Sequence, residues 1–282
     1  MKYGASFPVG DWGDILALRD FAQAMDEGGM DYVSLSTHLM SFPLGTYPDQ
    51  MLHHYVGPYQ EPLVLFSYLA GITQYIRFRT AVLILPLYPT ALLAKQAGDL
   101  ATISGGRFEL GVGISWNPNE YQALGQNFND RGRRFEEQIA LLRRLWTEPH
   151  VTFEGRFHHL EATGLNQLPP LIPILLGVGT ADRLLRRVAR IGDGWIPLAD
   201  PIEPLQRLHG YLKDEGRDPS TFPVSGRLMA REDNPKAWVE HTQRLVDAGI
   251  NDMEIFPGSG LTGQEAATRL LKARKALMEE FG

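Results

Sequence analysis

His38 is the side chain of this sequence best suited to acid–base chemistry, and the segment Gly177-Val178-Gly179-Thr180 is the best candidate for holding an anion. A histidine exchanges a proton near neutral pH and can also hydrogen-bond a bound ring. The glycine-rich segment precedes a predicted helix, whose free N–H groups and positive dipole end favour a phosphate, and Thr180 could cap that helix. Each feature has an ordinary alternative: a histidine bonded to a loop carbonyl, and a plain turn with a threonine cap.

A third group of polar residues, Trp116-Asn117-Pro118-Asn119-Glu120, follows a predicted strand. Asn119 could hydrogen-bond the edge of a heterocycle, and Glu120 could act as an acid or a base. A helix start would also explain Asn117, Pro118 and Glu120, as the capping residue, the first-turn proline and a first-turn acid. It would not explain Asn119, which therefore stays a candidate binding residue.

The composition excludes several kinds of site. The 282 residues contain no cysteine, so disulfides, thiolate metal sites and cysteine nucleophiles are ruled out. The neighbouring pairs His53-His54 and His158-His159 would point apart on a strand, so we predict no metal site there. A net charge of −6 gives no electrostatic attraction for nucleic acid or an anionic membrane surface. The GxGxxG dinucleotide fingerprint does not follow the first predicted strand.

One stretch shows which elements would position these side chains. An apolar run at 81–85, a helical pattern and a second apolar strand at 108–112 form a βαβ unit, whose two strands are parallel. Gly111 and Gly113, at the carboxyl end of the second strand, predict a close backbone approach by a ligand or by another part of the chain. A ligand site is therefore expected at this edge.

The same alternation runs along the whole chain and predicts one (β/α)8 TIM barrel domain over residues 1–282, with an open doubly wound sheet as the alternative. The chemistry of such a barrel lies on the loops after its strands. Long loops at 41–60 and 149–172 fall on that rim, and a hairpin is predicted to turn at Glu154-Gly155. The predicted strands are 3–7, 32–35, 77–85, 108–112, 173–177, 194–198, 223–229 and 252–256. The predicted helices are 14–27, 62–73, 92–103, a short one near Glu120, 131–146, 180–191, 203–215, 236–248 and 263–280.

Four blocks follow one another along the chain: TAVLILP at 80–86, SGGRFELGVGISW at 104–116, DRGRRFEEQIALLRRLWTEP at 130–149 and RRVARIGDGWIPLAD at 186–200. Together they resemble the luciferase-like monooxygenase superfamily, and more narrowly its coenzyme F420 (deazaflavin)-dependent oxidoreductase branch. The resemblance implies a (β/α)8 barrel, usually a homodimer, that binds a flavin or deazaflavin at the carboxyl ends of its strands. It also implies a non-prolyl cis peptide between Ala81 and Val82, behind the ring of the cofactor.

The resemblance also assigns roles to individual residues. His38 matches a histidine near the reactive carbon of the ring and is the expected catalytic residue. Asn119 matches a contact to the pyrimidine edge, and residues 177–180 match the segment that holds the tail phosphate. The expected cofactor-binding residues are Thr37, His38, Ala81, Val82, Gly113, Asn119, Gly177, Val178, Gly179 and Thr180. The side chains expected to line the substrate pocket are Met40, Phe42, Tyr47, Tyr55 and Trp116.

Three positions bear on the choice within the superfamily. Thr37-His38 replaces the Asp-His pair common in the deazaflavin branch, which leaves open what positions the histidine. Trp116 stands where similar deazaflavin sugar-phosphate dehydrogenases carry a catalytic glutamate, so that reaction is not expected. Ile114 stands where flavin mononucleotide (FMN) luciferases place a phosphate-binding arginine, which favours deazaflavin.

We therefore expect an oxidoreductase that uses coenzyme F420 to move a hydride to or from a small organic substrate. The alternatives are an FMN-dependent monooxygenase supplied with reduced flavin and O2, and a non-catalytic flavin- or deazaflavin-binding barrel. A sugar-phosphate isomerase is disfavoured, because no paired carboxylate base is apparent on the rim. The opening MKYGASFPVG has no charged-then-apolar leader, and no apolar run approaches the roughly 18 residues of a membrane span, so a cytoplasmic location is expected.

Overall fold

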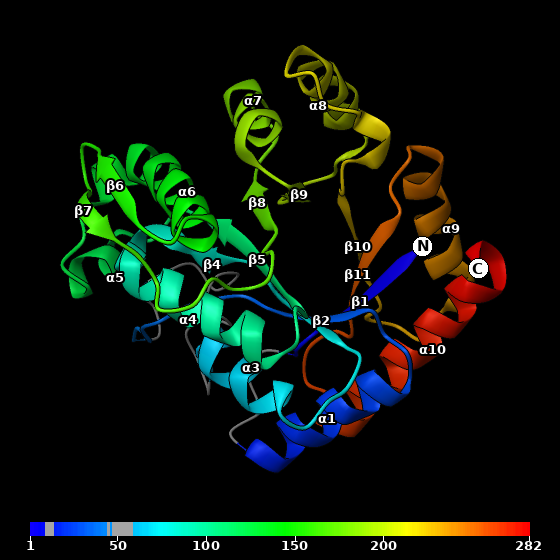
Figure 1. The fold of residues 1–282 in the computed structure, drawn as a ribbon. Helices are drawn as coiled ribbons and strands as arrows, with labels where there is room; N and C mark the ends of the chain where they lie inside the picture. Colours follow the sequence, from blue (N-terminus) through cyan, green and yellow to red (C-terminus); the bar gives the residue numbers. More distant parts are fainter. Residues whose placement is uncertain (9–13, 44–45, 47–58) are drawn as a thin grey trace.

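The computed structural model describes residues 1–8, 14–43, 46 and 59–282, and in them eight parallel strands form the wall of a nearly closed barrel (Figure 1). The order around the barrel is β10–β11–β1–β2–β3–β5–β8–β9, and the two end strands meet at a parallel bridge between Trp195 and Val224. A short strand, β4 (Leu83–Ile84), pairs with β5. The predicted (β/α)8 barrel is therefore confirmed. Its strands are β1 (Lys2–Ser6), β2 (Tyr32–Leu35), β3 (Arg77–Thr80), β5 (Phe108–Gly113), β8 (Ile174–Val178), β9 (Gly194–Pro197), β10 (Ser225–Met229) and β11 (Asp252–Phe256).

Helices surround the barrel, and a two-stranded hairpin lies beside α6 (Figure 1). The hairpin consists of β6 (Val151–Glu154) and β7 (His159–Thr163), so the turn predicted at Glu154-Gly155 is confirmed. None of the helices in the described residues combines the length and apolar character needed to cross a bilayer. The helices are α1 (Ile15–Glu27), α3 (Pro62–Ala70), α4 (Thr90–Ile103), α5 (Pro118–Ala123), α6 (Arg131–Thr147), α7 (Asp182–Ile191), α8 (Ile202–Asp214), α9 (Pro235–Asp247) and α10 (Gly263–Phe281), with short 3-10 helices η1 (Leu85–Leu87), η2 (Phe128–Asp130) and η3 (Pro219–Thr221).

Several predicted elements differ from the structure by one to three residues at their ends, and two differences bear on the site. The strand predicted at 77–85 is divided, because β3 ends at Thr80 and only two residues of β4 follow before the turn η1, which contains Pro86. An apolar run reports burial and does not report the direction of the backbone, so the break was not visible in the pattern. The helix predicted at 180–191 starts later, and Thr180 is not its cap: the backbone is still extended at Ala181, which occupies the capping position.

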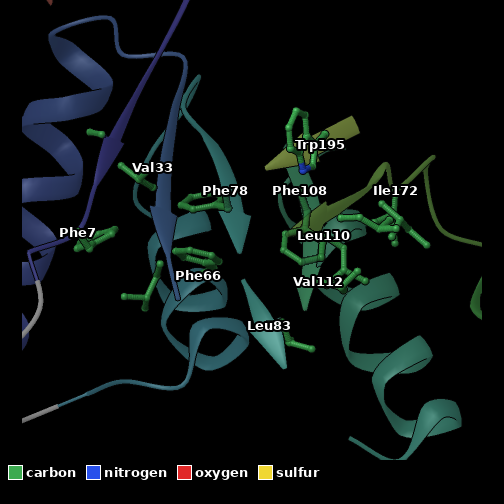
Figure 2. Close-up of a cluster of buried hydrophobic side chains, with 14 of the residues drawn as sticks. Phe7, Val33, Phe66, Phe78, Leu83, Phe108, Leu110, Val112, Ile172 and Trp195 are labelled. Carbon is green, nitrogen blue, oxygen red and sulfur yellow. The ribbon is translucent and has the colours of Figure 1, made fainter. Parts of the chain in front are cut away.

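The outer faces of the strands pack against the helices through apolar side chains. The rings of Phe78 of β3 and Phe66 of α3 pack in a tilted arrangement with centroids 5.2 Å apart, and Val33 of β2 lies in the same cluster (Figure 2). All six residues of β5 are buried. Glu109 contacts Arg79 inside the barrel, so the alternate residues Phe108, Leu110 and Val112, which belong to the apolar core, form the face of β5 that meets the helices. This packing holds the strand ends at fixed positions relative to one another.

The inner face of the barrel contains a buried charged cluster, in which Arg79 of β3 meets residues near the amino ends of four other strands. The Arg79 guanidinium donates to Glu109 and to Asp252, each at 2.8 Å, and to Ser225 at 3.1 Å. The Tyr32 ring lies 3.7 Å below the guanidinium. Burial acts to raise the pKa of Glu109, but Arg79 and Arg77 outweigh it and hold that pKa below the ordinary value. The cluster joins β2, β3, β5, β10 and β11, so it is part of the architecture.

The close approach predicted at Gly111 is made by the chain itself. A Cβ atom at Gly111 would lie 1.9 Å from the backbone oxygen of Thr80. The Thr80 hydroxyl also donates to the Gly111 carbonyl at 2.7 Å. Glycine is therefore needed here so that β5 can pass beside the end of β3.

Substitution of Gly111 by alanine is expected to lower the free energy of unfolding by about 1–3 kcal/mol or more, because backbone atoms cannot yield to the added methyl group. The matched control is Gly210→Ala, in helix α8, where an added Cβ meets nothing within 4 Å. That variant should be more stable by up to about 1 kcal/mol, since alanine favours the helix. Urea denaturation followed by circular dichroism measures both values. Equal midpoints for Gly111→Ala and the unmodified protein would contradict the predicted contact.

Candidate active site

The loop after β2 carries His38, helix α5 after β5 carries Glu120, and the fold brings the two side chains together. His38 Nδ1 lies 3.3 Å from Glu120 Oε2, although the residues are 82 positions apart. The other carboxylate oxygen, Oε1, accepts a hydrogen bond from the backbone N–H of Leu39 at 2.9 Å. The His38 side chain is 12% exposed and that of Glu120 is fully buried. A buried carboxylate therefore holds the loop that presents the histidine.

The start of α5 fixes the position of Glu120. Asn117 is the capping residue, and its side-chain oxygen accepts from the N–H of Asn119 at 3.0 Å. Pro118 occupies the first helical turn, as the helix-start explanation predicts. That explanation is correct for Asn117, Pro118 and Glu120, which is the first-turn acid of α5. It does not include the second role of Glu120 as the partner of His38. Asn119 is exposed on the same turn, and its contact with a heterocycle stays a prediction.

Tyr59 also contacts the histidine and was not among the predicted site residues. Its ring meets the His38 ring edge-on, with centroids 6.0 Å apart, and its hydroxyl is hydrogen-bonded to Ser36. Burial raises the pKa of Tyr59 to about 12, against a lowering effect of Ser36, and the charge of Glu120 adds to the increase. Tyr59 is therefore a neutral phenol near pH 7. An aromatic residue in a proline-rich loop carries no period that would have marked it.

The segment after β3 lies directly beside the loop of His38. The N–H of Thr37 donates to the Val82 carbonyl at 3.1 Å. The Ala81–Val82 peptide bond is cis, as the resemblance implies. The Val82 side chain occupies the space that Cβ atoms would need at Gly113 and Gly177, which would lie 2.7 and 2.4 Å from it. Five predicted cofactor-binding residues from four strand ends thus lie together.

The remaining predicted cofactor residues are Val178, the last residue of β8, and Gly179 and Thr180, which follow it before α7. The Val178 carbonyl accepts from the indole N–H of Trp195 at 3.1 Å, and the Thr180 carbonyl accepts from Arg207 of α8 at 3.2 Å. Arg207 also pairs with Asp182, the first residue of α7. No side chain of the described residues caps α7. The N–H of Leu184 donates to the Ala181 carbonyl at 2.8 Å, so the donors available to an anion at this helix end are the N–H groups of Asp182 and Arg183. This geometry suits an anion at Gly179 and Thr180.

Of the predicted substrate residues, Met40 and Phe42 follow β2 and Trp116 follows β5. Met40 is 42% exposed and Trp116 is 40% exposed, whereas Phe42 is half-buried. Exposed apolar side chains beside His38 and α5 offer contact area to an organic molecule. Tyr47 and Tyr55 lie outside the described residues, and the substrate role of all five stays a prediction.

The sequence also contains two pairs of adjacent histidines, His53-His54 and His158-His159. His53 and His54 lie outside the described residues. His158 Nδ1 lies 2.8 Å from Glu137 Oε1, and its Nε2 lies 2.6 Å from the Thr90 hydroxyl, so His158 ties the hairpin to α6 and α4. His159 is exposed and pairs with Glu154 across the hairpin.

Comparison with known proteins agrees with this geometry. The family model described as luciferase-like monooxygenase matches residues 5–280. An uncharacterised protein of Mycobacterium tuberculosis is 38% identical over 202 residues, which cover 70% of this chain and 68% of that protein. The F420-dependent hydroxymycolic acid dehydrogenase of the same organism is 28% identical over 223 residues, which cover 77% of this chain and 59% of that enzyme.

A solved structure shows the same fold over its whole length. The monooxygenase RslO1 from Streptomyces bottropensis superposes with a TM-score of 0.79 at 20% identity, and the match covers 100% of both chains. The family match covers nearly the whole sequence, and therefore includes the barrel strands, the histidine after β2 and the cis peptide after β3. The chain belongs to the luciferase-like monooxygenase family.

Proposed function

We propose that this protein is an oxidoreductase that uses coenzyme F420 for hydride transfer to or from a small organic substrate. The observation that carries the proposal is the His38–Glu120 pair, which lies at the carboxyl ends of β2 and β5, next to the Ala81–Val82 segment. Relatives named as F420-dependent dehydrogenases support the cofactor, and Ile114, in place of a phosphate-binding arginine, supports deazaflavin over FMN.

The residues of this site fit a flat ring with an anionic tail. Val82 fills the space above Gly113 and Gly177, so Ala81 and Val82 present a small, partly exposed apolar floor against which a ring can lie. The uncapped start of α7 provides N–H donors for a tail phosphate at Gly179 and Thr180. When bound, the deazaflavin supplies the hydride chemistry, and the protein supplies binding, orientation and proton handling.

His38 is the residue that we expect to act on the substrate. Its ring is partly exposed, whereas its carboxylate partner is buried, so the imidazole is the group that can reach a bound molecule. It would donate a hydrogen bond or move a proton at the reacting oxygen. Met40, Phe42 and Trp116 would supply apolar contact on the substrate side, with Asn119 at the edge of the ring.

The second candidate function is an FMN-dependent monooxygenase, which the similarity to the monooxygenase RslO1 favours. The third is a barrel that binds a flavin or deazaflavin without catalysis. Titration of the purified protein with F420 and with FMN, followed by fluorescence quenching, tests the cofactor. Tighter binding of F420 is expected. Binding of FMN about tenfold tighter, a difference of roughly 1.4 kcal/mol, would overturn the choice of cofactor.

We also propose that two copies of the chain associate. Val64 and Tyr68 lie one helical turn apart on α3, and Leu92 and Ile103 lie on the neighbouring α4; all four are exposed. Large apolar side chains exposed on two neighbouring helices favour a contact between protein surfaces. Light scattering should give twice the chain mass of 31.6 kDa, and a monomer would contradict the proposal.

A further inference from the structure

We infer that Glu120 is the positioning residue of His38, and that it fixes which nitrogen of the imidazole carries the proton. The inference rests on the proposed role of His38 in the reaction, but it concerns the histidine itself and is testable without cofactor. The residue next to His38 in sequence, Thr37, has no charge with which to orient the ring, so the orienting group must come from elsewhere in the fold.

Glu120 contacts the histidine loop with both carboxylate oxygens. Oε2 lies 3.3 Å from His38 Nδ1, and Oε1 accepts from the Leu39 N–H at 2.9 Å. The first distance is at the long end for an N–H···O bond, and such catalytic bonds often shorten when a ligand binds. The second contact anchors the carboxylate to the backbone next to the ring. The pair of contacts leaves the carboxylate one orientation relative to the loop.

This arrangement selects one tautomer. An ionised carboxylate can only accept hydrogen bonds, so Nδ1 must be the donor in the contact with Oε2. The neutral imidazole then carries its proton on Nδ1, and Nε2 can only accept a hydrogen bond. The nitrogen that carries the proton is therefore set by a residue 82 positions away in the sequence.

Glutamine at position 120 should reverse this choice. The backbone N–H of Leu39 requires an acceptor, so the amide oxygen would take the place of Oε1. The amide NH2 group would then point at Nδ1, which could only accept. Neutral His38 would move its proton to Nε2. A role of Glu120 limited to the fold predicts no such reversal, because the shape of the side chain is unchanged.

The experiment is 15N NMR of the histidine rings in the full-length protein without cofactor, at a pH where His38 is neutral. The unmodified protein should show a protonated Nδ1, and Glu120→Gln should show a protonated Nε2. The His38 signal is assigned with His38→Gln. The matched control is Glu137→Gln, because Glu137 holds His158 Nδ1 and nearby backbone N–H groups in the same manner, away from the site. That variant should change the ring signals of His158 and leave those of His38 unchanged.

Kinetics then separates positioning from binding. Glu120→Gln should lower kcat by at least about tenfold, as the loss of an orienting partner does in other histidine sites, with the cofactor Kd little changed. Glu137→Gln should keep full turnover.

A neutral His38 protonated on Nε2 in the unmodified protein would overturn the inference, and so would an unchanged tautomer in a folded Glu120→Gln variant. If Glu120→Gln does not fold, the tautomer of the unmodified protein still decides. Failure of the F420 titration would leave this result intact, so the two proposals fail separately.

Discussion

Replacement of His38 by alanine is expected to lower turnover by about 100- to 10,000-fold, the range for loss of a general acid–base group. Cofactor affinity should change little, because the floor at Ala81 and Val82 and the uncapped start of α7 are untouched. Turnover is measured from the absorbance of F420 with a substrate that the unmodified protein accepts. The cofactor Kd is measured by fluorescence quenching.

This comparison also separates an enzyme from a binding module. His159→Ala is the matched control, since His159 is exposed on the hairpin and contacts Glu154 instead of the site. It should keep full turnover and affinity. An equal loss of turnover and affinity in His38→Ala, or a loss of neither, would indicate a barrel that binds the cofactor without catalysis.

Replacement of Arg79 by methionine is expected to lower the free energy of unfolding by about 3–5 kcal/mol, the usual cost of leaving buried charges without their partner. Arg79, Glu109 and Asp252 are each less than 6% exposed, and the guanidinium donates to both carboxylates. The matched control is Arg77→Met. Arg77 also bonds Glu109, but its side chain is 35% exposed, so the loss should stay below about 1 kcal/mol. Urea denaturation at pH 7 measures both, and equal losses would contradict the prediction.

The effect of Arg79→Met should depend on pH. In the folded protein the pKa of Glu109 lies below its ordinary value of 4.5, so its ion pairs stabilise the fold above that pH. The contribution is lost as the pH falls through the folded-state pKa. The stability difference between the unmodified protein and Arg79→Met should therefore shrink in acid. A difference that grows as the pH falls would show that Glu109 does not carry the effect.

Much of the barrel could be predicted from the sequence because burial on both faces leaves a local pattern. Strands β2 and β11 begin and end where the apolar runs predict, and α6 buries the face of Phe135, Ile139 and Leu142. The resemblance of four sequence blocks located the cis peptide at Ala81–Val82. Local pattern failed where backbone direction matters, at the division of β3 from β4 and at Ala181, which takes the capping position expected for Thr180.

The sequence by itself determined the fold class, the order of the strands along the chain and the presence of a histidine after the second strand, because each depends on residues close together in the chain. Only the tertiary structure decided that Glu120 faces His38, that Arg79 joins Glu109 and Asp252, and that Thr80 occupies the space beside Gly111. These contacts join residues about 30 to 170 positions apart, and their geometry follows from the closure and register of the barrel. No local spacing encodes that register, so side chains that are individually recognisable acquire partners only when the barrel closes.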